Sequence, residues 1–174
     1  MSKSIQIGAN FIGKFHNEVS LQAMNTEVQV FPVMDGAYVI SRSQHAILGF
    51  ISKLLKALTD GFVKENELRH KFIVRDALSY GPIYNGNDIP VDAFCPEQAG
   101  NQRRESIDKY KGSLLFDLPM IQAFNSEINA PPFGIYIHES ARLFHQIVNA
   151  HYARYGMIGF AIRLFVTVPM LYQN

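Results

Sequence analysis

The spacing of hydrophobic residues along this chain predicts a strand-forming segment with one helix before it and one helix after it. Residues 11–24 carry apolar side chains at a loose helical spacing. Residues 43–60 form one apolar stripe with lysines on the opposite face, so both segments predict helices. Ser41 or Ser43 is suited to cap the start of the second helix, and Gly61 to end it.

Between these helices, residues 28–41 form two short runs rich in β-branched and aromatic residues, which predict strands. The Asp35-Gly36 pair between the runs predicts a hairpin, because glycine accepts the positive φ that a tight turn requires. Pro32 cannot donate a ladder hydrogen bond, so the first strand should be bulged or lie at an edge. Asp35 either binds a hard cation through its oxygens or only supplies turn chemistry.

The rest of the chain alternates between predicted strands and helices. Strands are predicted at residues 4–7, 72–80, 113–116, 133–138 and 160–168, and helices at 117–130 and 139–155. Gly81-Pro82 should end the strand at 72–80, and Gly86 belongs to a second bend. Residues 87–112 are polar and predict a long surface excursion with one short helix. This order predicts an α+β fold in which helices cover a mixed sheet.

Composition and charge narrow the class of protein. The 174 residues are 48% hydrophobic and 12% aromatic, which is ample for the core of a single domain over residues 1–174. A net charge of +1 without a run of like charges disfavours nucleic acid as a partner. No apolar run is long enough to cross a membrane, and the start lacks the apolar core of a signal peptide. With a single cysteine, the expected location is the cytoplasm.

Other side chains are weaker candidates for a functional site. Cys95 stands between Phe94 and Pro96 without a nearby histidine, which favours a structural thiol over a nucleophile. Histidines 138, 145 and 151 with Glu139 lack the spacing of a zinc site. Ser79 and Ser113 have no accompanying base at a recognisable spacing. The hairpin with Asp35 therefore remains the main candidate for a functional site.

Three blocks together resemble the class III nucleotidyl cyclase domain, the palm-like catalytic domain of adenylate and guanylate cyclases, in its short stand-alone bacterial form. The blocks are the hairpin from residue 31 with its following helix, the strand and glycine turn at 74–86, and the strand-helix-strand segment at 115–137. The resemblance lies within residues 28–140, about two thirds of the chain. It implies a ferredoxin-like palm, with a mixed or antiparallel sheet covered by helices.

The resemblance also implies a site and a reaction. The hairpin of that family displays a metal-binding aspartate, which falls on Asp35 here, with Mg²⁺ or Mn²⁺ as the cofactor. Gly36, Arg75 and Asn125 complete the candidate substrate-binding positions; Arg75, beside Asp76, is either a phosphate contact or half of an ion pair at the sheet's edge. The implied substrate is a nucleoside triphosphate, whose 3′-hydroxyl attacks the α-phosphate with loss of pyrophosphate. Because the family's active site forms between two domains, a homodimer or heterodimer is implied.

Two departures from the family pattern lead to an alternative. The family carries a first metal carboxylate on a strand before the hairpin, whereas no Asp precedes Asp35, so that strand is lost or lies upstream of the recorded start. Helix positions where the family has Asn and Arg fall on Ile121 and Asn125, which carry no charge to offset the phosphates. The alternative function is a catalytically inactive cyclase-like module that binds a nucleotide or a partner protein. A third possibility is an unrelated α+β domain.

Overall fold

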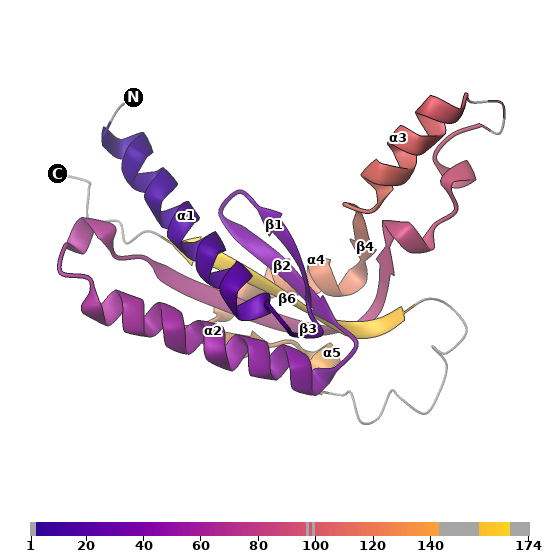
Figure 1. Ribbon diagram of the computed structural model, residues 1–174. Helices are drawn as coiled ribbons and strands as arrows, with labels where there is room; N and C mark the ends of the chain where they lie inside the picture. Colours follow the sequence, from indigo (N-terminus) through magenta and orange to yellow (C-terminus); the bar gives the residue numbers. More distant parts are fainter. Residues whose placement is uncertain (1–2, 97, 99, 143–156, 168–174) are drawn as a thin grey trace.

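The computed structural model describes residues 3–96, 98, 100–142 and 157–167. Six strands in these ranges form one mixed sheet in the order β1-β2-β6-β3-β4, with β5 paired to β3 (Figure 1). The strands are β1 Gln29–Val33, β2 Gly36–Ser41, β3 Ile73–Asn85, β4 Leu115–Asp117, β5 Gly134–Ile137 and β6 Met157–Thr167. The helices are α1 Lys3–Ala23, α2 Gln44–Lys64, α3 Asn101–Lys111, α4 Leu118–Ser126 and α5 Glu139–Arg142, with short 3₁₀ turns η1 Leu68–His70, η2 Gly86–Asp88, η3 Val91–Ala93 and η4 Glu127–Asn129. The predicted α+β class is confirmed.

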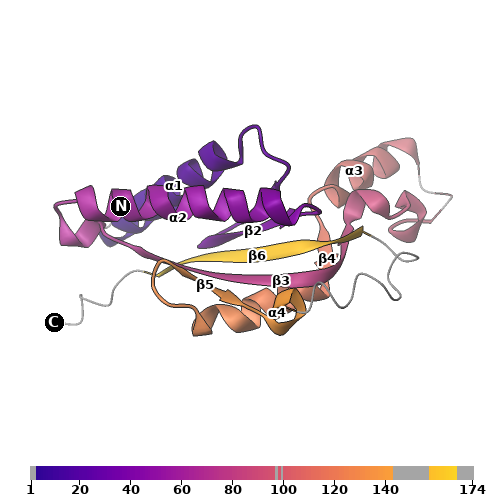
Figure 2. The same ribbon diagram turned by 90° about the horizontal axis from the view of Figure 1, so that it is seen from below.

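Helices cover both faces of the sheet. Helices α1 and α2 lie on one face, and α4 lies on the other (Figure 2). The main core lies under α1 and α2, where β2, β3 and β6 present their inward side chains to both helices. Its largest fully buried apolar side chains include Phe15 of α1, Phe50 and Leu54 of α2, and Phe160 of β6. None of the helices in the described ranges is long and apolar enough to cross a membrane.

The C-terminal strand β6 lies in the middle of the sheet. It is antiparallel to β2 on one side and to β3 on the other. Strands β2 and β3 are therefore parallel to each other, and α2 connects them. This arrangement is a β-α-β unit split by a third strand, and the inserted strand comes from the far end of the chain.

The ends of the first two helices differ from the sequence prediction. Residues 4–7, predicted as a strand, belong to α1, whose residues Phe11, Phe15 and Val19 follow at helical spacing and are buried. Helix α2 starts as predicted, because the side chain of Ser43 accepts a hydrogen bond from the Ala46 amide. The predicted end at Gly61 is wrong: α2 continues to Lys64, nearly two turns beyond its last buried residue, Leu58.

Strand β3 continues through Gly81-Pro82, where the sequence predicted its end. Pairing with β5 stops at Leu78 and pairing with β4 starts at Ile83, so none of the described strands lies beside Pro82 on that side. The missing amide hydrogen of Pro82 can face this gap without breaking a ladder bond. The chain turns at Gly86 instead, where an added Cβ would lie 1.9 Å from the carbonyl oxygen of Lys111.

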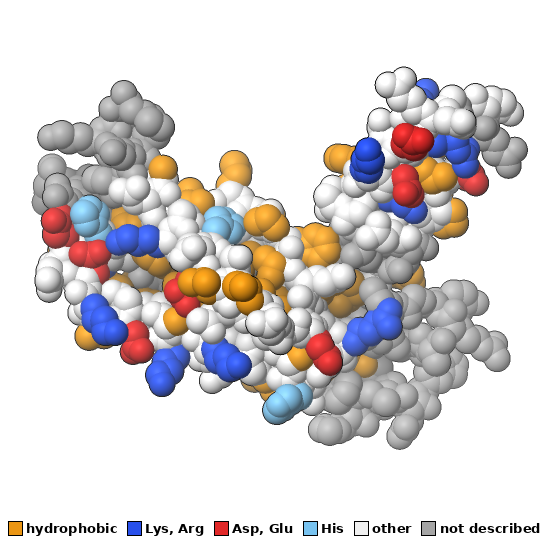
Figure 3. Space-filling model, in the orientation of Figure 1, with side chains coloured by type: hydrophobic (Ala, Val, Ile, Leu, Met, Phe, Trp, Pro, Cys, Tyr) orange, Lys and Arg blue, Asp and Glu red, His pale blue; other side chains and the backbone are white. Residues whose placement is uncertain are grey.

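The predicted surface excursion stands away from the body of the molecule as an arm that contains η2, η3 and α3 (Figures 1 and 3). Its base is closed by a hydrogen bond from the Gly86 amide to the Leu114 carbonyl. Within it, Lys111 donates to the Ile89 carbonyl, and Cys95 is buried, as expected for a structural thiol. The helix predicted at 139–155 is described only as α5, and residues 143–155 lie outside the described residues.

Candidate functional site

Asp35 lies in the turn of the β1–β2 hairpin, where the sequence placed it. Val33 pairs with Gly36, so Met34 and Asp35 are the two turn residues and Gly36 is the buried first residue of β2. The Asp35 side chain is 53% exposed, and its Oδ1 lies 4.0 Å from Nη2 of Arg163 on β6. The carboxylate assigned to a metal ion therefore faces a cation of the protein itself.

Arg163 is the centre of a compact set of contacts, called here the Arg163 cluster: Arg163, Asp35, Tyr38, Phe124 and Glu127. Its Nε donates to Oε2 of Glu127 at 2.5 Å, and its Nη1 donates to the Tyr38 hydroxyl at 2.9 Å. The guanidinium also lies over the rings of Tyr38 and Phe124, with centroid distances of 5.1 and 4.7 Å. Burial acts to lower the pKa of Arg163, but the hydrogen bond and charge of Glu127 outweigh it and raise that pKa. Arg163 is therefore a permanent cation.

The Arg163 cluster places a permanent cation beside the carboxylate that is predicted to bind a metal ion. The described residues contain no group of three or more His, Cys, Asp or Glu side chains that could hold a metal ion. A divalent cation at Asp35 would approach the guanidinium of Arg163, and like charges at such short range repel strongly. Metal binding at Asp35 stays a prediction.

The other predicted substrate-binding residues are only partly brought together. Gly36, Phe165 and Arg75 lie in one row across β2, β6 and β3, so Gly36 and Arg75 are about 10 Å apart at the strand spacing of antiparallel sheets. The Nε of Arg75 is buried and has no hydrogen-bond partner among the described residues. Asn125, by contrast, is exposed on α4. Two of the three positions therefore share a row with the hairpin.

The ion pair considered for Arg75 and Asp76 is not formed, and β3 is an internal strand rather than an edge. Consecutive strand residues point to opposite faces, and Asp76 pairs with Leu164 on the face covered by α1 and α2. Asp76 is fully buried, and neither of its carboxylate oxygens has a hydrogen-bond partner within the described ranges. Burial raises the pKa of this carboxyl well above its ordinary value.

Sequence reasoning missed Arg163, Glu127 and Asp76 as important residues. The available signs were a single arginine within the apolar run of β6, and a single aspartate at an inward position between Val74 and Leu78 of β3. Arg163 and Asp76 are both charged residues at strand positions where the hydrophobic pattern predicts burial. Ser79 is explained structurally, because its hydroxyl donates to the Pro119 carbonyl at 2.5 Å.

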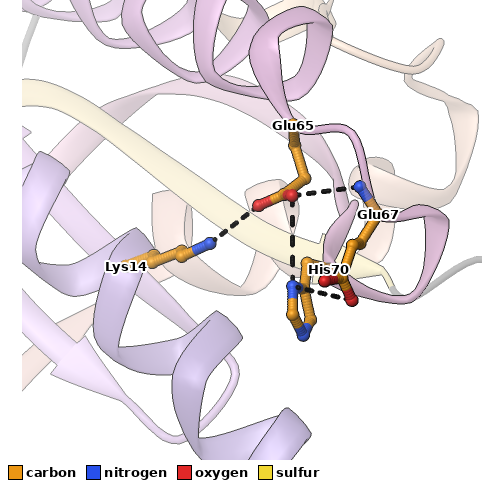
Figure 4. Close-up of polar contacts among 4 residues, drawn as sticks. All are labelled: Lys14, Glu65, Glu67 and His70. Carbon is orange, nitrogen blue, oxygen red and sulfur yellow. Dashed lines mark hydrogen bonds and ion pairs between the residues drawn. The ribbon is translucent and has the colours of Figure 1, made fainter.

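A second group of polar residues lies on the other side of the sheet, between α1 and the end of α2 (Figure 4). Lys14 Nζ donates to Glu65 Oε2 at 3.1 Å, and the Glu67 amide donates to Glu65 Oε1 at 3.1 Å. His70 Nδ1 lies 3.9 Å from Glu65 and 3.7 Å from Glu67. The amide of Glu67 and the ammonium of Lys14 lower the pKa of Glu65, so this carboxylate stays charged.

Comparison of the chain with models of protein families, with curated proteins and with solved structures gives no match.

Proposed function

We propose that this chain is a nucleotidyl cyclase-like domain that pairs with a second copy of itself and does not cyclise nucleotides with its own residues alone. The strand order supports the cyclase-like part. A split β-α-β unit is a building block of the ferredoxin-like palm, and β2-α2-β3 with β6 inserted between the strands is such a unit. The hairpin with Asp35 is attached to this unit, as the resemblance requires.

The contact between Arg163 and Asp35 is the observation that carries the inactive part of the proposal. Two-metal phosphoryl chemistry needs paired carboxylates, whose cations clamp the attacking and leaving oxygens. The strand next to the hairpin is β6, which contains no Asp or Glu and presents Arg163 toward Asp35 at 4.0 Å. The charge of Asp35 is thus already opposed by the protein.

Exposed apolar residues of α4 and η4 support the pairing. Helix α4 buries Pro119 and Ala123 against the sheet and turns its larger apolar side chains outward. We call the exposed set the α4 ridge: Leu118, Ile121, Phe124 and Ile128, with exposed fractions of 56, 58, 51 and 75%. Contiguous exposed apolar residues mark protein interaction sites. The ridge contacts the Arg163 cluster through Phe124. The family resemblance implies a homodimer or a heterodimer, and we propose the homodimer.

An active cyclase is the second candidate, and the exposure of Asp35 favours it. The carboxylate is half accessible at the hairpin turn, and Arg75 lies in the row of Gly36, where a cation could meet a phosphate. Such an enzyme would need a second domain to supply further carboxylates for Mg²⁺ or Mn²⁺. The two candidates differ in whether a second domain supplies such carboxylates.

A product assay tests the proposal. The purified chain is incubated with each of the four ribonucleoside triphosphates and Mn²⁺, beside Asp35→Ala and the control Asp60→Ala, which alters an exposed carboxylate of α2. We expect no cyclic mononucleotide by mass spectrometry from any of the three proteins. Product from the parent and from Asp60→Ala, but not from Asp35→Ala, would overturn the proposal and establish an active cyclase.

A further inference from the structure

A cleft of about 290 Å³ lies between α1 and the C-terminal end of α2, with residues 70–72 at its base. Helices α1 and α2, which line the cleft, cover the face of the sheet opposite α4 (Figure 2). Its volume is near the lower end for ligand sites, roughly 300 Å³. The cleft therefore suits a small molecule rather than a nucleoside triphosphate.

The charges that line this cleft are balanced in sign. Lys14 and Lys71 contribute positive charge, and Glu18 and Glu65 contribute negative charge. Glu65 already accepts from Lys14 and from a backbone amide (Figure 4), yet a carboxylate has about four acceptor positions and can receive further donors. A balanced lining disfavours a polyanion or a polycation and favours a ligand that carries both signs.

Lys71 is the cation of this cleft that is available to a ligand. Its Nζ lies 4.8 Å from the centre of the Phe62 ring, and none of the described carboxylates forms an ion pair with it. Phe62, Phe72 and Leu58 add apolar surface to the same cleft. An anionic group at Lys71 would therefore have apolar surface directly beside it.

We propose that this cleft binds a small zwitterion, an α-amino acid with an apolar side chain. The ligand carboxylate meets the ammonium of Lys71, the ligand ammonium meets the carboxylate of Glu65, and the apolar side chain lies against Phe62 and Phe72. The site is separate from Asp35 and does not depend on the proposed pairing or on cyclase activity.

Calorimetric titration tests this site with L-leucine and L-phenylalanine as probes. We expect both to bind the parent chain, while the methyl esters, which lack the carboxylate, and the N-acetyl derivatives, which lack the ammonium, do not. Lys71→Met and Glu65→Gln should each weaken binding about tenfold or more, since each loses a charge-assisted hydrogen bond. The control Lys56→Met, at an exposed position of α2, should bind like the parent.

Other results would overturn the site. These are no heat of binding with either amino acid, equal affinity for the blocked derivatives, or unchanged affinity in Lys71→Met. Urea unfolding of each variant shows that it is folded; if Lys71→Met is not, Glu65→Gln and the blocked derivatives decide the question alone.

Discussion

The guanidinium of Arg163 and the carboxylate of Glu127 form a short ion pair, with 2.5 Å between Nε and Oε2. It joins the central strand β6 to η4, the turn that follows α4. The two side chains are only 9 and 15% exposed, so the pair is shielded from water. Since Arg163 also contacts Tyr38 and Asp35, one buried cation links the hairpin to the segment that carries the α4 ridge.

Loss of the cation should destabilise the protein. Removing one partner of a buried pair leaves the other charge uncompensated and costs about 3 kcal/mol. We expect Arg163→Met to lower the free energy of unfolding by this amount in urea, and the double variant with Glu127→Met to recover part of the loss. A loss no larger than that of Lys53→Met, at an exposed position of α2, would show that the pair is not stabilising.

The buried carboxyl of Asp76 should make stability depend on pH. Its pKa is raised well above the ordinary 3.8 by burial, so the folded state holds a proton that the unfolded chain releases. This contribution to stability is complete below pH 3.8 and is lost as the pH rises toward the folded-state pKa, by about 1.4 kcal/mol per pH unit.

Asp76→Asn isolates this effect, because the amide is neutral at every pH. The variant should gain stability relative to the parent as the pH rises from 4 toward neutrality, measured by urea unfolding at each pH. A difference between the two proteins that does not change with pH would contradict the account of Asp76.

Two glycines should respond to alanine in opposite directions. At Gly86 an added Cβ would lie 1.9 Å from the backbone oxygen of Lys111, so Gly86→Ala must displace the base of the excursion and lower the melting temperature. At Gly13, in α1, an added Cβ meets nothing within 4 Å. Gly13→Ala should stabilise the protein by about 0.5–1 kcal/mol. Equal effects of the two substitutions in thermal unfolding would refute this explanation of Gly86.

Local sequence patterns predicted the helices and turns that depend on residues close together along the chain. The hairpin at Asp35 and the helix α2 depend on neighbours within a few residues, and both elements are confirmed, although Gly36 lies in β2 rather than in the turn. Pro32 lies in β1, an edge strand of the sheet, as its missing amide hydrogen requires.

The features that the sequence did not predict depend on contacts between residues that are far apart along the chain. The central place of β6 depends on pairing with strands more than 70 residues away, which no window of sequence contains. The continuation of β3 through Pro82 depends on a gap between two partner strands. For the candidate site, sequence located Asp35 but not the contact with Arg163, because that contact exists only once β6 lies beside the hairpin.

The mass of the protein in solution tests the central claim, self-pairing through the α4 ridge. We would measure it by light scattering on a size-exclusion column for the parent, for Ile121→Glu on the ridge, and for the control Val63→Glu, an exposed apolar residue of α2. The account predicts twice the 19.7 kDa of one chain for the parent and the control, and the mass of one chain for Ile121→Glu. A single-chain mass for the parent at every concentration, or a dimer that survives Ile121→Glu, would contradict it.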